Sequence, residues 1–196
     1  MNRHDETMRI EDFIEGARAG VDAIDIDATR GVARVLVEGA ERGARVFIAG
    51  NGGSAAMASH FQNDLVKAAA VPGTPPIRAL SLMDNVPLLT AWANDDAWDV
   101  ALVRELETLS EAGDLLVVIS TSGRSPNLVN AARWASDHGL KVISMTGRAA
   151  NPVADASAHW LPVATDKVPL AEALFDLLCH ALAWEAKALR EGVADR

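Results

Sequence analysis

The sequence predicts an α/β fold, with a five-stranded parallel sheet of flavodoxin-like type flanked by helices. Five short apolar runs alternate with segments of helical periodicity, the pattern of parallel strands joined by helical crossovers. The run 115–119 is apolar without alternation, as expected of a strand that is covered on both faces. Since no segment has the composition of a linker, residues 1–196 are predicted to form one domain.

Two helices are predicted before the first strand. Apolar residues recur at helical spacing over 10–20 and again over 28–42, after a polar leader at 1–6. Residues 1–42 therefore form a helical segment ahead of an α/β core and C-terminal helix at 43–196. We expect the segment to serve oligomerisation, because helices placed before a sheet often pack on another subunit.

The first strand, predicted at 46–49, leads into a Gly-Asn-Gly-Gly turn at 50–53 and a helix over 54–67. Ser54 is a preferred N-cap residue. Glycines in such a turn let an anion approach the backbone, where N–H groups and the positive end of the helix dipole face it. We interpret the stretch as a phosphate cradle, although an ordinary strand-to-helix turn has a similar pattern. It matches neither a dinucleotide fingerprint nor a Walker A loop.

The remaining elements follow from periodicity and turn residues. After a Pro- and Gly-rich break, the predicted strands are 77–82, 115–119, 141–145 and 158–163. The predicted helices are 86–93, 98–111, 126–138 and 169–190, with a break at Asn94, Asp95 and Asp96.

Composition limits the class of protein. The chain is 49% hydrophobic and carries a formal net charge of −9, which argues against broad nucleic-acid binding and requires any phosphate site to be made locally. No apolar stretch reaches the roughly 18 residues of a membrane span, and the first residues do not form a signal peptide, so we expect a cytoplasmic protein without membrane association. The single cysteine, Cys179, is predicted to be buried.

A second loop with hydroxyl side chains follows the strand 115–119. Four of the six residues at 120–125 are Ser or Thr, with Ser125 as the predicted N-cap and Pro126 at the first helical position. Ligands of open α/β sheets bind outside the carboxyl ends of strands. Hydroxyls and N–H groups suit a phosphate monoester, and Arg124 is the better-placed basic side chain for contacting it.

Several motifs along the chain form one combination. They are Gly50-Asn51-Gly52-Gly53-Ser54, His60-Phe61, Asn94-Asp95, Ile119-Ser120-Thr121-Ser122-Gly123-Arg124-Ser125 and Met145-Thr146-Gly147. This combination resembles the sugar isomerase (SIS) domain, and within it the phosphoheptose isomerase family. The resemblance covers nearly the whole chain.

The resemblance implies a homotetramer that converts sedoheptulose 7-phosphate to D-glycero-D-manno-heptose 7-phosphate, with one zinc ion per active site. It implies a sugar contact at Asp95. The phosphate contacts that it implies are Asn51, Ser54, Ser120, Thr121, Ser122 and Ser125. The cradle interpretation adds Gly52 and Gly53 to this substrate site.

The chemistry of such a reaction can be matched to residues. Moving a carbonyl from C2 to C1 requires a base that takes a proton from carbon and an acid that serves the oxygens, through an enediol that a metal ion would stabilise. His60 and Asp64 are four residues apart and share a helix face, and Glu172, Asp176 and His180 repeat at the same spacing. Two imidazoles and three carboxylates are compatible with zinc.

Carried over residue by residue, the resemblance implies metal ligands at His60, Asp64, Glu172 and His180, with Asp64 as the base and His180 as the acid. The family usually has Glu at the position of Asp64 and Gln at the position of Glu172. A carboxylate shortened by one methylene would sit roughly 1.5 Å further back, and a misplacement of about 1 Å can cost on the order of a hundredfold in rate. The extra charge of Glu172 would favour a divalent cation and so offset this.

Other interpretations stay open. Glu172 and His180 are about 12 Å apart along a helix axis, so they share an ion only if both side chains lean inward or if different subunits contribute them. Asp176 could instead pair with His180 on a solvated helix face. The chain could also be an SIS adaptor that binds a replication initiator, or a phosphosugar sensor. The Asp64 and Glu172 changes could signal a longer substrate, such as an eight-carbon sugar phosphate.

Overall fold

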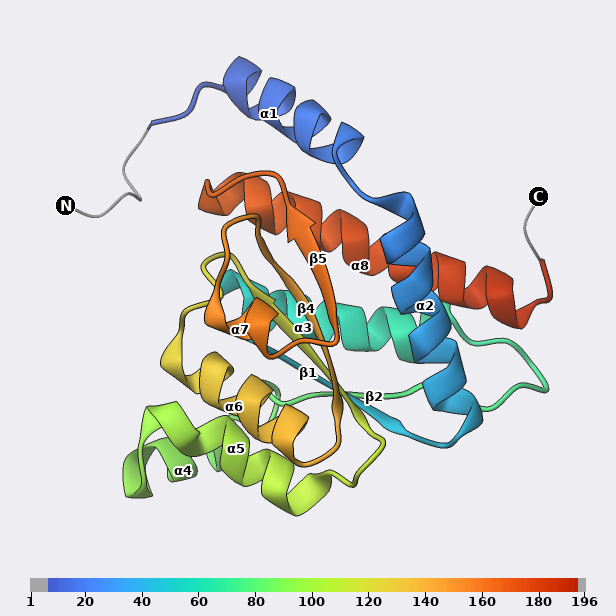
Figure 1. Ribbon diagram of the computed structural model, residues 1–196, viewed down its shortest axis with the longest axis vertical. Coiled ribbons are helices and arrows are strands. Elements are labelled where there is room, and N and C mark those ends of the chain that lie inside the picture. The colour runs from blue at the N-terminus through green and yellow to red at the C-terminus, as the bar shows by residue number, and fades with distance from the viewer. Residues whose placement is uncertain (1–6, 194–196) are drawn as a thin grey trace.

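The computed structural model describes residues 7–193, so the polar leader predicted at 1–6 lies outside the described residues. Its centre is a parallel sheet of five strands in the order β2-β1-β3-β4-β5, with helices on both faces (Figure 1). This is the flavodoxin-like order, and the predicted fold class is confirmed.

Each predicted strand and helix is present, with ends shifted by a few residues. The strands are β1 Arg45–Gly50, β2 Arg78–Ser81, β3 Leu115–Ser120, β4 Lys141–Gly147 and β5 His159–Val163. The α-helices are α1 Ile10–Asp22, α2 Ile26–Glu41, α3 Gly53–Asn63, α4 Val86–Asp95, α5 Trp98–Leu109, α6 Pro126–Asp137, α7 Pro152–Asp155 and α8 Val168–Arg190. A π-helix, η1 Asp64–Ala68, follows α3, and the short α7 was not predicted.

Two local predictions are wrong. Ser54 is not the N-cap of the central helix: Gly52 takes that position with a φ of 57°, and the helix begins at Gly53. Only a residue that tolerates positive φ fits this turn easily, and this requirement outweighs the capping preference of Ser54. Asp95 does not lie in a break either, because it is the last residue of α4.

The central helix also differs from the single element predicted over 54–67. It is α-helical to Asn63 and changes to a π-helix at Asp64. The backbone N–H of Ala69 donates to the carbonyl of Asp64 at 2.8 Å, which is the five-residue spacing of a π turn. The helix therefore widens at a residue predicted to be catalytic.

The central strands are buried because alternate residues feed two separate cores. Ile48 of β1 and Val117 of β3 face the core shared with α2, α3 and α8. Phe47 and Leu116 face the opposite core, shared with α5 and α6. Covering both faces explains why 115–119 is apolar without alternation.

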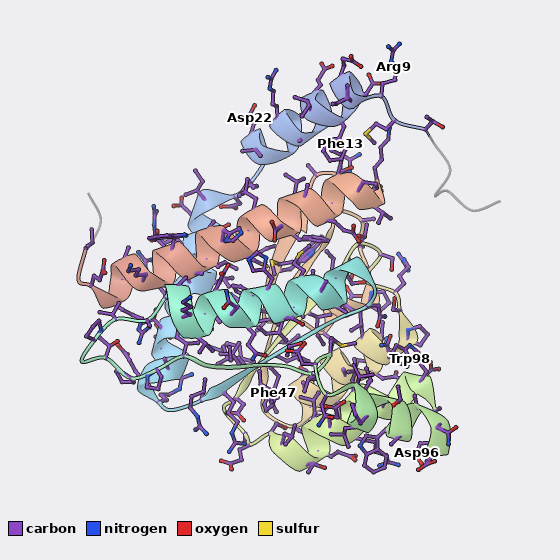
Figure 2. All side chains as sticks on the ribbon, turned by 180° about the vertical axis from the view of Figure 1, so that it is seen from behind. Arg9, Phe13, Asp22, Phe47, Asp96 and Trp98 are labelled. Atoms are coloured by element: carbon purple, nitrogen blue, oxygen red, sulfur yellow. The ribbon has the colours of Figure 1, made fainter. Side chains whose placement is uncertain are left out.

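Helix α1 rests on α8 through two glycines. A Cβ on Gly16 would lie 2.8 Å from Leu170, and a Cβ on Gly20 would lie 2.5 Å from Leu174, so only glycine allows this approach without a shift of the leucines. Figure 2 shows α1, between the labelled Arg9 and Asp22, standing outside the rest of the molecule beside α8. No helix of the described chain is long and apolar enough to cross a membrane.

A carboxyl group is buried on the α5 side of the sheet. Glu105 is 2% exposed, beside the buried Leu102 and Leu106 on the same helix. Its Oε1 has no hydrogen-bond partner among the described residues. Burial raises the pKa of Glu105 from its ordinary 4.5 to about 7.

We expect Glu105→Gln to stabilise the protein at about pH 8 by roughly 1–3 kcal/mol, and to have little effect near pH 4. The folded pKa lies above the unfolded one. Between about 4.5 and about 7 the unfolded state therefore loses its proton first, and the wild type loses stability as the pH rises. Thermal unfolding of the wild type and Glu105→Gln across this pH range tests the prediction. Glu38→Gln, at an exposed position, is the control and should follow the wild type. Equal pH dependence of the wild type and Glu105→Gln would contradict the prediction.

Candidate active site

The two predicted phosphate loops meet at the carboxyl edge of the sheet. Gly50 at the end of β1 is paired with Ile119 near the end of β3, so the loops that follow are neighbours. The amide side chains of Asn51 and Asn127 join them: each Nδ2 donates to the other Oδ1 at 2.9 Å. The structure therefore brings the turn at 50–53 next to the start of α6, which directly follows the hydroxyl loop.

Glycines shape the first loop. A Cβ on Gly50 would lie 2.5 Å from the carbonyl oxygen of Ser54, so the strand passes close to the first helical turn. Gly52 has positive φ, and no side chain within residues 7–193 caps the α3 N-terminus. Ser54 is buried beneath this turn. The turn has the glycines of an anion cradle, but the N–H groups of Ser54 and Ala55 donate to the carbonyls of Asn51 and Gly52 in this structure.

The second loop is held by its own hydroxyls. Ser120 Oγ accepts a hydrogen bond from the Gly123 N–H at 3.2 Å, and Ser122 Oγ accepts one from the Arg124 N–H at 3.2 Å. Ser125 is the N-cap of α6, as predicted, and its side chain makes no capping bond. The Thr121 carbonyl accepts from the Gly147 N–H at 3.1 Å. The loop is thus fixed to the adjoining strand.

Asn151 supports this loop from outside. Gly123 has a φ of 60°, and a Cβ there would lie 1.9 Å from Asn151 Oδ1. Asn151 Nδ2 donates to Thr146 Oγ1 at 2.9 Å, and Asn151 Oδ1 accepts from the Ala154 N–H at 2.9 Å. The guanidinium of Arg124 does not face the hydroxyl loop in this structure, since its Nη2 donates to the Ala150 carbonyl at 2.7 Å.

A second group of polar side chains lies between α3 and α8, which run side by side across one face of the sheet (Figure 2). Asp64 Oδ2 is 2.9 Å from His180 Nδ1, and Asp64 Oδ1 is 3.8 Å from His60 Nε2. Asp176 Oδ1 is 3.3 Å from His60 Nδ1, and Asp176 Oδ2 is 3.9 Å from His180 Nε2. The imidazole rings meet edge to face, with centroids 4.9 Å apart.

Asp64 is the buried member of this group. It is 6% exposed, whereas His60, Asp176 and His180 are all partly open to solvent. Its Oδ2 makes no hydrogen bond of good geometry within the described chain, despite the nearby His180 nitrogen. A buried acceptor without a donor suits a cation, and one ligand atom each from His60, Asp64 and His180 lie within 4.8 Å of one another. The residues present therefore fit a metal ion with nitrogen and oxygen ligands.

Two predicted residues stand apart from this group. The carboxylate of Glu172 lies against the start of α3, where a Cβ on Gly53 would be 2.4 Å from Glu172 Oε1. Asp95 is exposed at the end of α4, and its Oδ1 accepts from the Asn94 amide at 2.9 Å. Cys179 is buried, as predicted, and burial raises the pKa of its thiol, so it has none of the properties of a reactive nucleophile.

Sequence reasoning missed two residues that position the loops. Asn127 and Asn151 are buried. The Asn127 amide bonds to Asn51, which is far from it in the chain, whereas the Asn151 amide bonds to the nearby Thr146 and Ala154 and its side chain lies against Gly123. Each stands beside a proline at the start of a helix, Pro126 or Pro152, which is the local signal that marks them. Their partners become visible only in the folded chain.

The chain is similar to known proteins over most of its length. Residues 12–147 match the SIS domain. A phosphoheptose isomerase of Mycobacterium bovis (strain BCG / Pasteur 1173P2) is 38% identical over 150 residues, which are 76% of each protein.

Two solved structures share the fold at 27% sequence identity, each with a TM-score of 0.81. For a phosphoheptose isomerase from Francisella tularensis, the matched region is 90% of this chain and 92% of that protein's chain. The corresponding figures for the phosphoheptose isomerase of Neisseria gonorrhoeae are 91% and 94%. With the sheet order, the paired loops and the histidine–carboxylate cluster, these similarities show that the chain belongs to the SIS domain family and, within it, to the phosphoheptose isomerases.

Proposed function

We propose that the protein is a phosphoheptose isomerase that interconverts sedoheptulose 7-phosphate and D-glycero-D-manno-heptose 7-phosphate. The observation that carries the proposal is that two polar sites are arranged along α3. The proposed phosphate cradle is the turn at the start of α3, and His60 lies further along this helix. Asp64 follows in η1, and His180 reaches the same cluster from the neighbouring α8. One site suits the phosphate, and the other suits proton transfer at the far end of the sugar.

The spacing of the two sites fits a substrate of this length. His60 is six residues beyond Ser54, a rise of about 9 Å along an α-helix. An extended chain of seven carbons, with bonds of about 1.5 Å, spans a similar length. A phosphate on C7 would therefore leave the C1 end of the sugar near His60, whose ring centroid is 4.9 Å from that of His180.

We assign the proton transfers to two residues. Asp64 takes the proton from C1 of the ketose and returns it to C2, and His180 moves a proton between the two oxygens. Asp64 is buried and His180 is partly open, so the base is better shielded from bulk water than the acid is. The phosphate, at the other end of the sugar, would be held by two segments. These are the hydroxyl loop, through Ser120, Thr121, Ser122 and Ser125, and the first loop, through Asn51 and Ser54.

A zinc ion is the proposed cofactor, because the donor set of His60, Asp64 and His180 suits it. When bound, the ion would stabilise negative charge on the enediolate oxygens. Glu172 stays a predicted fourth ligand; its carboxylate lies near Gly53, at the start of α3. The sugar contact at Asp95 likewise stays a prediction.

We further propose a homotetramer assembled through the N-terminal helices. Ile10 and Ile26 are 73% and 67% exposed, and Ile14 and Val21 are 45% and 42% exposed, on α1 and α2. Apolar side chains in such a row gain free energy when a second copy covers them. The single SIS domain over 1–196 and the cytoplasmic location stay predictions.

The decisive experiment is incubation of the protein with sedoheptulose 7-phosphate, with added zinc or with a chelator, following the aldose by NMR. We expect product with zinc and its loss with the chelator. A five-carbon ketose phosphate is the matched control and should turn over more slowly, because it cannot span both sites. No product with any divalent metal, from a folded protein, would contradict the proposal and lead to longer sugar phosphates next.

A further inference from the structure

Asp176 belongs to the histidine–carboxylate cluster but has no place in the ligand set implied by the family. Its carboxylate is 3.3 Å from His60 Nδ1 and 3.9 Å from His180 Nε2. Asp64 faces the other nitrogen of each ring. Each imidazole thus lies between two carboxylates, one buried and one half-exposed.

The two carboxylates differ in what they can do for His60. A neutral imidazole that offers one nitrogen to a cation carries its proton on the other nitrogen, and that proton needs an acceptor. His60 Nε2 points to the buried Asp64, where Oδ2 lacks a hydrogen-bond donor. His60 Nδ1 is paired with Asp176 Oδ1 at 3.3 Å, slightly longer than an ordinary N–H···O hydrogen bond.

We propose that Asp176 is a positioning residue of the metal site, which accepts the Nδ1 proton of His60 and so presents His60 Nε2 to the cation. A carboxylate that holds a metal-binding histidine in one tautomer also raises the basicity of the ring. The inference rests on the metal site of the proposed function, but it concerns only this chain's side chains and can be read without turnover.

Other carboxylates of α8 do not compete for this role. Glu172 is one helical turn before Asp176, about 6 Å along the axis, and its carboxylate lies against Gly53. Glu185 is occupied by Arg30, whose Nε donates to it at 3.1 Å. Among the described residues of α8, Asp176 is therefore the carboxylate that faces His60.

The first test is zinc affinity, measured by competition with a chromophoric chelator. We expect Asp176→Ala to weaken zinc binding by about 10- to 100-fold, the usual loss when such a partner is removed. Asp176→Asn keeps an oxygen that accepts the Nδ1 proton, so it should lose less than Asp176→Ala. The exposed Asp137→Asn is the control for loss of one negative charge and should bind zinc as the wild type does. Affinity of Asp176→Ala within twofold of the wild type would overturn the proposal, as would equal losses in the two Asp176 variants.

The second test reads the tautomer by nitrogen-15 NMR of the imidazole rings at about pH 8, where an ordinary imidazole is neutral. We expect the His60 proton on Nδ1 with and without zinc, and a mixture of tautomers in metal-free Asp176→Ala. A proton on Nε2 of His60 in the wild type would overturn the proposal. Zinc affinity and the His60 tautomer are both measured without turnover. If both results are as expected but sedoheptulose 7-phosphate is not converted, the proposed function fails and this inference stands.

Discussion

Asp64→Asn is expected to lower kcat by about a thousandfold or more, while the protein stays folded. An amide cannot take a proton from carbon, and general acid–base catalysis commonly contributes about 10²- to 10⁴-fold. Asp64 is also the buried member of the proposed ligand set, so the variant should bind less zinc. Steady-state kinetics with sedoheptulose 7-phosphate and metal analysis of the purified variant measure both losses.

Two companion variants separate the causes. Asp137→Asn removes an exposed carboxylate at the end of α6 and should leave kcat unchanged. Asp64→Glu lengthens the side chain by one methylene and should keep activity within about a hundredfold of the wild type, since the base is present but displaced by roughly 1.5 Å. If Asp64→Asn keeps more than a tenth of the wild-type kcat, Asp64 is not the base.

Gly123→Ala is expected to lower kcat/KM by at least about a hundredfold through loss of phosphate binding. The residue has a φ of 60°, and its new Cβ would lie 1.9 Å from Asn151 Oδ1. A left-handed conformation alone costs an alanine roughly 1–2 kcal/mol, and the clash forces the loop or Asn151 to move. The Ser120 and Ser122 hydroxyls, which now bond within the loop, would lose their arrangement.

A matched glycine exists for this experiment. Gly31 lies in α2, where a Cβ would meet nothing within 4 Å, so Gly31→Ala should keep full activity and unfold at the same or a higher temperature. Calorimetric titration with inorganic phosphate tests binding without turnover. Wild-type affinity in Gly123→Ala would show that the hydroxyl loop does not hold the phosphate.

The fold was predictable because its signals are repeated along the chain. The run 115–119 is apolar throughout because the side chains of β3 pack into a core on each face of the sheet. Burial on both faces requires apolar residues at successive positions, so the sequence alone shows it. The loops at 50–53 and 120–125 were predictable for a similar reason. Glycine, serine and proline at strand ends mark turns and helix starts. Which loops are neighbours then follows from the parallel sheet.

What escaped prediction depends on three-dimensional packing. A capping preference pointed to Ser54, but the turn geometry places Gly52 there. The spacing of four on α8 offered Glu172 and Asp176 equally, and only the packing of α3 against α8 puts Asp176 beside His60 and Glu172 beside Gly53. One turn of π-helix cannot be distinguished from an α-helix by periodicity, because the two patterns differ by less than one residue per turn.

The π turn at 64–68 has a consequence for how this chain tolerates changes in length. Its hydrogen bond joins residues five apart, one more than the four of an α-helical turn, so the turn contains one extra residue. Deleting one residue after Asp64 would let the backbone close as an ordinary α-helix, with every ladder bond remade. The cost would fall on the contacts beyond it, since Arg190 holds the Ala69 carbonyl at the end of the turn. The π turn is therefore a place where the chain can lose one residue without moving Asp64, although the residues after the turn would shift.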